Sequence, residues 1–215
     1  MNPSQRALDP SERVSEVLFG LIMVLTFTGS LSVATAGRAE VREMLVGALG
    51  CNLAWGVIDA LLYVMGVLAE KGRGLTVWHA VRAAPDPGAG QRMIAAALPP
   101  VVASLLEAPE LEAMRRRLSD LPEPPARPRL GGEDWKAALA VFLLVVVSIF
   151  PVVLPFVLMS DAIRALRLSN GIAIVMLFFC GYATGRLTRY HPWGTGFAMV
   201  LLGALLVSMT MALGG

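Results

Sequence analysis

An acidic residue, Asp59, stands within the apolar run formed by residues 44–68, which is long enough to cross a bilayer and contains no Lys or Arg. A carboxylate near the middle of a membrane costs a few kcal/mol or more, so such residues usually face the interior of a helix bundle and carry function. Without a cation in the run, Asp59 is protonated, meets a transported cation, or alternates between these states. This residue therefore points to cation transport or proton-coupled transport.

A second polar residue in the same run, Asn52, precedes Asp59 by seven positions. Residues with this spacing share nearly one face of a helix. They lie about 10 Å apart along the helix axis, too far to hydrogen-bond each other directly. Two interpretations stay open: the residues are successive stations on one pathway, or each bonds a polar group on a neighbouring helix, such as Thr26 or Thr28.

Two further carboxylates stand at the ends of apolar runs, Glu16 at the start of the first and Glu43 at the start of the second. The helix dipole stabilises acidic residues near helix N-termini, so a purely structural role is open for both. Together with Asp59, they would mark the inner mouth, the middle and the outer mouth of a path. Oxygen ligands suit hard or borderline divalent cations such as Mn²⁺ and Fe²⁺.

The elements that must position these residues are apolar segments of membrane-spanning length. The 215 residues are 56% hydrophobic and 16% charged, whereas a soluble domain has about 25% charged residues. A span needs about 20 predominantly apolar residues. We therefore expect an all-α integral membrane protein with five transmembrane helices, over residues 14–36, 41–68, 135–159, 168–187 and 193–213.

A polar insertion separates the second span from the third. We expect a small helical cytoplasmic loop over residues 70–133, with helices over 91–106, interrupted by two prolines, and over 109–118, followed by a Pro-rich extended linker. The chain then divides into residues 1–69 (N-terminal tail and helices 1–2), 70–133 (the loop) and 134–215 (helices 3–5). In the third span, Pro151 and Pro155 predict a kinked helix or a distorted helix beside a pathway.

Charge placement predicts the orientation. Ten of the 18 Lys and Arg residues lie between Lys71 and Lys136. The positive-inside rule therefore places the N-terminus and the 70–133 loop in the cytoplasm and the C-terminus outside. No nucleophile–base arrangement or nucleotide-binding motif occurs, so we expect neither an enzyme nor a nucleic-acid-binding protein. Cys51 and Cys180 lie among apolar residues and indicate packing rather than a disulfide.

Several short motifs, taken together, resemble those of the vacuolar iron transporter (VIT/CCC-type) family. Ser15-Glu16 resembles the family's Ser-Asp-Gly opening, and EMLVGALGC, residues 43–51, resembles its E-x-x-x-G-A-x-S-M segment. SIFPVVLPF, residues 148–156, is similar to G-x-x-P-x-x-P-[YF], and residues 185–203 resemble the entry to the last helix. The chain departs from these patterns in having Glu16 for Asp, Gly50 for Ser, Cys51 for Met, Ser148 for Gly and one extra residue between the prolines.

The resemblance implies a five-span, homodimeric transporter that exports Fe²⁺ or Mn²⁺ from the cytosol by proton exchange, here in a bacterial inner membrane. It places Glu16, Glu43 and Cys51 on the ion path. The assignment of Asp59 and Asn52 to that path rests only on the cost of polar residues within an apolar span. The metal is then the transported substrate, with no permanently bound cofactor, and the partners are protons, membrane lipid and a second copy.

Plant and fungal members of that family carry a glutamate-rich helical metal-binding domain between the second and third spans. The loop of this chain holds Glu107, Glu110 and Glu112, but they do not align with that domain, and three consecutive arginines, residues 115–117, oppose cation capture. The alternative is a non-transporting member of the same fold, a membrane scaffold or partner-binding protein whose basic loop contacts anionic lipid or a soluble partner.

Overall fold

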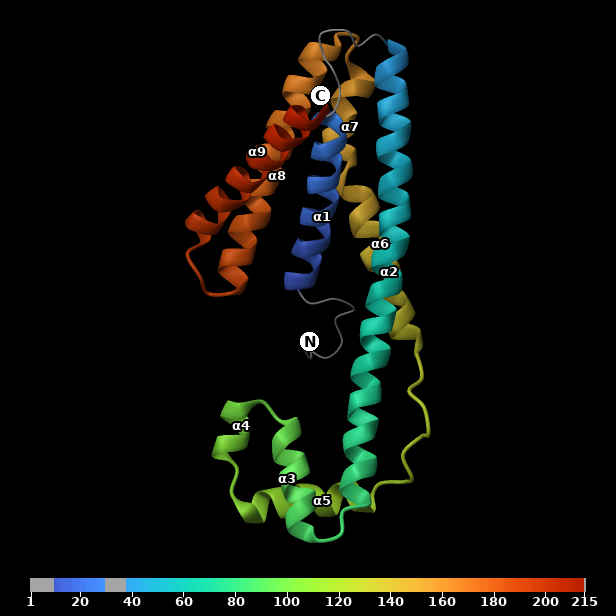
Figure 1. The fold of residues 1–215 in the computed structure, drawn as a ribbon, viewed down its shortest axis with the longest axis vertical. Coiled ribbons are helices and arrows are strands. Elements are labelled where there is room, and N and C mark those ends of the chain that lie inside the picture. The colour runs from blue at the N-terminus through green and yellow to red at the C-terminus, as the bar shows by residue number, and fades with distance from the viewer. Residues whose placement is uncertain (1–9, 30–37, 215) are drawn as a thin grey trace. The chain divides into compact units, whose positions relative to one another are not determined.

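The computed structural model describes residues 10–29 and 38–214, and this part of the chain is helical, without strands (Figure 1). The predicted N-terminal tail before residue 10 and residues 30–36 of the predicted first span lie outside the described residues. The helices in chain order are α1 (Pro10–Gly29), α2 (Arg38–Arg82), α3 (Pro87–Ala97), α4 (Pro100–Leu105), α5 (Ala108–Asp120), α6 (Gly132–Ser148), α7 (Phe150–Leu158), α8 (Ala162–Leu187) and α9 (Pro192–Gly214).

The predicted all-α class is confirmed, and the apolar helices fit a membrane protein. Three described segments are long and apolar enough to cross a bilayer: Val41–Arg82, Gly132–Leu158 and Ala162–Leu187. Within the described residues, Pro192–Leu206 is a shorter apolar helix. The count of five spans stays a prediction.

The chain forms two compact units. The bundle unit comprises Met1–Tyr63 and Glu133–Gly215, and the insertion unit comprises Val64–Gly132. The helix α2 contributes its first part to the bundle unit and its last part to the insertion unit.

The core of the bundle unit lies between α1, α7 and α8. Leu21 and Val24 of α1 pack in one cluster with Val152 of α7 and Leu177 of α8, and all four are almost fully buried. At Gly181 on α8, an added Cβ would collide with the backbone of α9 at Thr195. Small residues at such contacts let helix backbones approach closely, which is the usual way that helices pack in membranes.

The predicted third span corresponds to Gly132–Leu158 and is interrupted at one residue. The helix α6 ends at Ser148 and α7 begins at Phe150, so Ile149 separates them. Pro151 stands in the first turn of α7, where its missing N–H is tolerated, whereas Pro155 lies inside α7. The Ser169 hydroxyl of α8 donates to the Val152 carbonyl at 2.7 Å. The distortion predicted from the prolines is therefore present, and a hydroxyl of a neighbouring helix bonds to the buried backbone of α7.

The insertion unit begins with a helix where the sequence predicted a loop. The apolar run ends at residue 68, but α2 continues through Gly72 and Gly74 to Arg82, and the first proline after it is Pro85. Side chains of this extension hold the C-terminal end of α5: Trp78 Nε1 donates to the Leu118 carbonyl at 3.0 Å, and Arg82 donates to the Leu121 carbonyl at 2.7 Å. Such donors satisfy carbonyls that lack partners at a helix end.

The short helices of the insertion unit follow from their caps. Asp86 caps α3 by accepting from the Ala89 N–H at 2.8 Å, with Pro87 in the first turn. The two predicted helices, 91–106 with its proline interruption and 109–118, correspond to α3 with α4 and to α5. Leu98 and Pro99 separate α3 from α4, which begins at Pro100, as expected of prolines that cannot continue a preceding helix.

Candidate functional site

The antiparallel helices α1 and α2 meet along a seam in the bundle unit, and three facing pairs of side chains line it. The pairs follow one another at three- or four-residue steps, which keeps them on one face of each helix. We call this set the α1–α2 seam: Glu16 with Asp59, Phe19 with Trp55, and Met23 with Cys51.

A carboxyl pair forms one end of the seam. The Glu16 and Asp59 side chains are hydrogen-bonded to each other, and both are half-buried. Two carboxyl groups can share a hydrogen bond only if one of them holds a proton, because two ionised carboxylates repel each other and neither can donate. The Oδ2 atom of Asp59 is buried and has no hydrogen-bond partner among the described residues. The pair therefore holds at least one proton and has one buried oxygen without a hydrogen-bond partner among the described residues.

This pairing corrects the expected placement of the two carboxylates along a path. The sequence placed Glu16 at the inner mouth and Asp59 in the middle, as separate stations. In the structure they stand at the same level of the seam. The reason is the register between α1 and α2, which matches residue 16 with residue 59.

Asn52 is the most deeply buried polar residue of α2 in the described chain. Its side chain is 1% exposed, and neither carboxamide atom has a hydrogen-bond partner among the described residues. The predicted alternative partners, Thr26 and Thr28, have side chains that lie outside the described part. An unsatisfied buried amide costs about 1–3 kcal/mol. Such a group is expected where a water or an ion supplies the missing partner.

An aromatic pair separates the carboxyl pair from a sulfur pair. The rings of Phe19 and Trp55 meet edge to face, with centroids 5.3 Å apart and an interplanar angle of 71°. Beyond them, Cys51 Sγ lies 3.9 Å from Met23 Sδ. The sequence reasoning found Cys51 but missed Met23. A signal was present, because Met23 follows Glu16 by seven residues and so lies on the same face of α1.

Glu43 lies apart from the seam. It is exposed near the start of α2, sixteen residues from Asp59 and thus about 24 Å away along the helix axis. A shallow hollow there is lined by Arg42, Glu43, Val46 and Gly47. Within the described residues, no three His, Cys, Asp or Glu side chains converge as a ready-made metal site. The predicted site residues therefore occupy different levels of α1 and α2, with Glu16 and Asp59 brought together.

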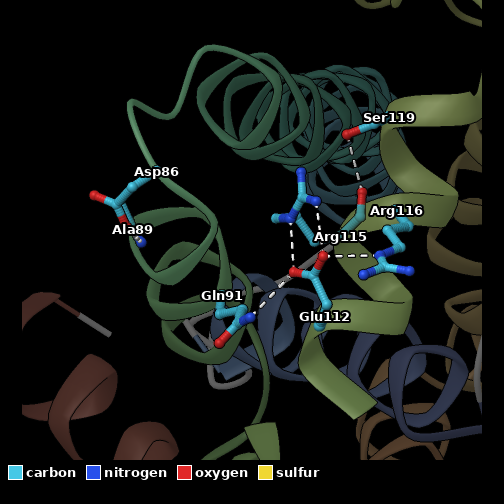
Figure 2. Close-up of polar contacts among 7 residues, drawn as sticks. All are labelled: Asp86, Ala89, Gln91, Glu112, Arg115, Arg116 and Ser119. Carbon is cyan, nitrogen blue, oxygen red and sulfur yellow. Dashed lines mark hydrogen bonds and ion pairs between the residues drawn. The ribbon is translucent and has the colours of Figure 1, made fainter. Parts of the chain in front are cut away.

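In the insertion unit, the Glu112 carboxylate accepts hydrogen bonds from three side chains (Figure 2). We call this arrangement the Glu112 clasp. Arg115 donates to both oxygens of Glu112 at 2.8 Å, Arg116 donates at 2.9 Å, and Gln91 of α3 donates at 3.1 Å. Hydrogen bonds from Arg115, Arg116 and Gln91 hold the pKa of Glu112 well below its usual range. The carboxylate is thus already occupied by two guanidinium groups, and it ties α3 to α5.

The other two glutamates expected to be of interest in the loop also have structural partners. Glu107 caps α5, and the Glu110 side chain accepts from the Glu107 backbone N–H at 2.8 Å, so the two form a capping box. Together with the Glu112 clasp, this gives a structural partner to each of the three glutamates singled out in the sequence. The insertion unit as described is a packed helical module.

The chain is similar to known metal transporters in two comparisons. The VIT family model matches residues 90–215, which is more than half of the chain. A protein of Oryza sativa subsp. japonica named Vacuolar iron transporter 1 is 26% identical over 218 aligned residues, which cover 94% of this chain and 84% of that protein. The family match begins after α2, whereas the alignment with the rice protein covers nearly the whole chain.

Proposed function

Because this chain belongs to the VIT family, we propose that it is a multi-pass membrane transporter that moves Fe²⁺ or Mn²⁺ out of the cytosol in exchange for protons. The name of the rice relative supports iron as cargo. The oxygen ligands on α1 and α2 suit either ion, because carboxylates bind hard and borderline divalent cations.

The hydrogen-bonded pair of Glu16 and Asp59 carries this proposal. A divalent ion and a proton compete for the same carboxylate oxygens, so binding of the ion expels the shared proton and return of the proton expels the ion. The buried, unpartnered Oδ2 atom of Asp59 is the position at which an arriving ion makes its first contact. The pair thereby couples metal movement to proton movement in the opposite direction.

The remaining predicted residues extend the path along α2. Glu43, about 24 Å from Asp59, exchanges ions with solvent at the opposite end of the helix. Asn52 and Cys51 lie between these two carboxylates and offer an oxygen ligand and a sulfur ligand. An ion crosses a membrane only if no single site binds it too tightly. A series of weak sites therefore favours transport.

We further propose that the protein is a homodimer in a bacterial inner membrane, with residues 70–133 in the cytoplasm. Large apolar side chains of α2 are exposed in the single chain, among them Leu53 at 51%, Val57 at 57% and Leu61 at 58%. Lipid or a second copy must cover them, since exposed apolar surface of this extent marks such contacts. The charge excess in the 70–133 segment supports its cytoplasmic placement.

The decisive experiment is metal flux into liposomes that contain the purified protein, with a pH gradient imposed and then removed. Asp59→Asn removes the exchangeable proton while keeping the size of the side chain. Glu70→Gln, an exposed carboxylate on the same helix, is the matched control. We expect gradient-dependent Fe²⁺ and Mn²⁺ flux in the wild type and in the control, and no such flux in Asp59→Asn. Intact wild-type protein without flux would favour the non-transporting scaffold instead.

A further inference from the structure

The insertion unit carries an exposed apolar surface on α4. Val101 and Leu105 are 73% and 75% exposed, and Val102 is 42% exposed. The run from Met93 to Leu106, at the end of α3 and through α4, contains no charged residue. We call residues 93–106 the α4 apolar segment. Single apolar residues on a surface are ordinary, but a contiguous group of them marks a contact with another molecule or with a membrane.

The packing of the insertion unit leaves this surface uncovered. The helix α3 buries Gly90 and Ile94, and Gln91 ties it to α5 through the Glu112 clasp. By contrast, every residue of α4 is at least partly exposed. The large apolar side chains of α4 therefore add little to the core of this unit, and their presence needs another explanation.

Within the insertion unit, the helix lengths bring α4 back to the level at which the apolar run of α2 ends. Residues 69–82 extend α2 by about 21 Å beyond that run. After the turn that follows α2, α3 runs in the opposite direction (Figure 1), and its 11 residues return about 16 Å. The start of α4 is thus about 5 Å beyond the end of the apolar run. The headgroup layer on each side of a bilayer is about 5–8 Å thick.

We propose that the α4 apolar segment lies in the membrane interface, with Val101, Val102 and Leu105 among the headgroups and upper acyl chains of the lipid. Apolar side chains of an interfacial helix reach about 5–10 Å into this boundary. Because the segment has no carboxylate, it enters the boundary without burying a charge. Arg92, which is exposed next to the segment, keeps its guanidinium group among the lipid phosphates.

Lipid fits this surface better than a second copy of the chain does. A stable protein interface involves about 20–30 residues on each side, whereas α4 is six residues long and exposes Val101, Val102 and Leu105 as its large apolar side chains. A bilayer adapts to so small a surface. It is also within reach, because segments long and apolar enough to cross a membrane flank the unit on both sides, Val41–Arg82 and Gly132–Leu158.

The test places a fluorescent probe on α4 of the full-length protein in liposomes. Cys51→Ser and Cys180→Ser remove the native thiols, and Leu105→Cys then carries an NBD label, whose emission depends on its surroundings. The side chain at 105 is largely exposed, so the label disturbs no core. Glu123→Cys, at an exposed position of the linker in the same unit, is the matched control. The phosphatidylcholine vesicles are made with and without a lipid that carries a nitroxide near its headgroup, which quenches a probe in the membrane interface.

We expect the nitroxide lipid to quench most of the emission from position 105 and almost none from position 123. A second pair of variants tests the apolar contact, with the probe at Val102→Cys. Leu105→Glu should lower the quenching at 102, because it places a charge in the boundary. Ala113→Glu, at an exposed position of α5, should leave that quenching unchanged.

Equal and weak quenching at 105 and 123 would overturn the inference. A disulfide between two copies of unlabelled Leu105→Cys, formed without quenching of the labelled protein, would also overturn it and would identify a second copy as the occupant. The readout involves neither metal nor protons, so its outcome is distinct from success or failure of the proposed transport.

Discussion

Glu16 of α1 and Asp59 of α2 are hydrogen-bonded through their carboxyl groups, although 43 positions separate them in the sequence. The bond requires one proton for the two groups, and it joins two helices whose other contacts along the seam are an aromatic pair and a sulfur pair. The two residues therefore act as a unit, and their substitutions should not behave independently.

Non-additivity is the first expected consequence. Glu16→Gln and Asp59→Asn should each lower proton-driven metal flux about tenfold or more, and the double variant should lose little beyond either single one, since residues that work as a unit are strongly coupled. The measurement is the initial rate of Mn²⁺ flux into liposomes for the wild type, the two single variants and the double variant. Losses that multiply in the double variant would show that the two carboxyl groups work at separate stations.

Metal binding should release protons. An ion that replaces the shared proton makes apparent affinity rise with pH, because fewer protons then compete for the carboxylate oxygens. The measurement is proton release on addition of Mn²⁺ to weakly buffered protein in detergent, reported by a pH dye. Asp59→Asn should release fewer protons per bound ion than wild type, and equal release from both proteins would contradict the role of the pair.

Asn52→Leu should stabilise the protein and impair transport at the same time. Leucine removes the cost of burying an amide without partners, which is about 1–3 kcal/mol of folding free energy. An ion that passes residue 52 then lacks an oxygen ligand, so transport falls. The measurements are thermal unfolding in detergent and metal flux on the same preparation. A destabilised Asn52→Leu protein would mean that the amide has a structural partner in the folded state.

The Glu112 clasp should stabilise the insertion unit over a wide range of pH. Hydrogen bonds from Arg115, Arg116 and Gln91 hold the pKa of Glu112 below its ordinary value of 4.5. The stabilisation is therefore fully present above about pH 4.5 and is lost only as the pH falls through the lower folded value. Glu112→Gln should make the unit more sensitive to trypsin at neutral pH, with Glu123→Gln in the linker as control. Equal cleavage rates in the two variants would argue against the clasp.

What the sequence predicted well depends on short-range patterns. Asp59 stood out because a single charge in an apolar run is costly, and the break at Ile149 follows from the prolines after it. The capped helices of the insertion unit likewise follow from Pro, Asp and Glu at helix starts.

What the sequence could not supply depends on how helices meet. Nothing within α1 alone identifies Asp59 as the partner of Glu16, because their pairing is set by the register between two helices. The spacing places Met23 on the same face of α1 as Glu16, but only the structure shows that Met23 contacts Cys51. The sequence predicts a loop from residue 70, whereas α2 continues to Arg82, because the end of an apolar run ends a membrane span but does not end a helix.

The number of protons that the carboxyl pair takes up also decides the electrical character of the proposed cycle. If one proton returns for each divalent ion that leaves, each turnover carries one net positive charge across the bilayer. A cytosol that is negative inside then opposes export by about 2.3 kcal/mol for every 100 mV. The voltage across the membrane, and not the proton gradient alone, would set how far such a protein can deplete the cytosol of metal.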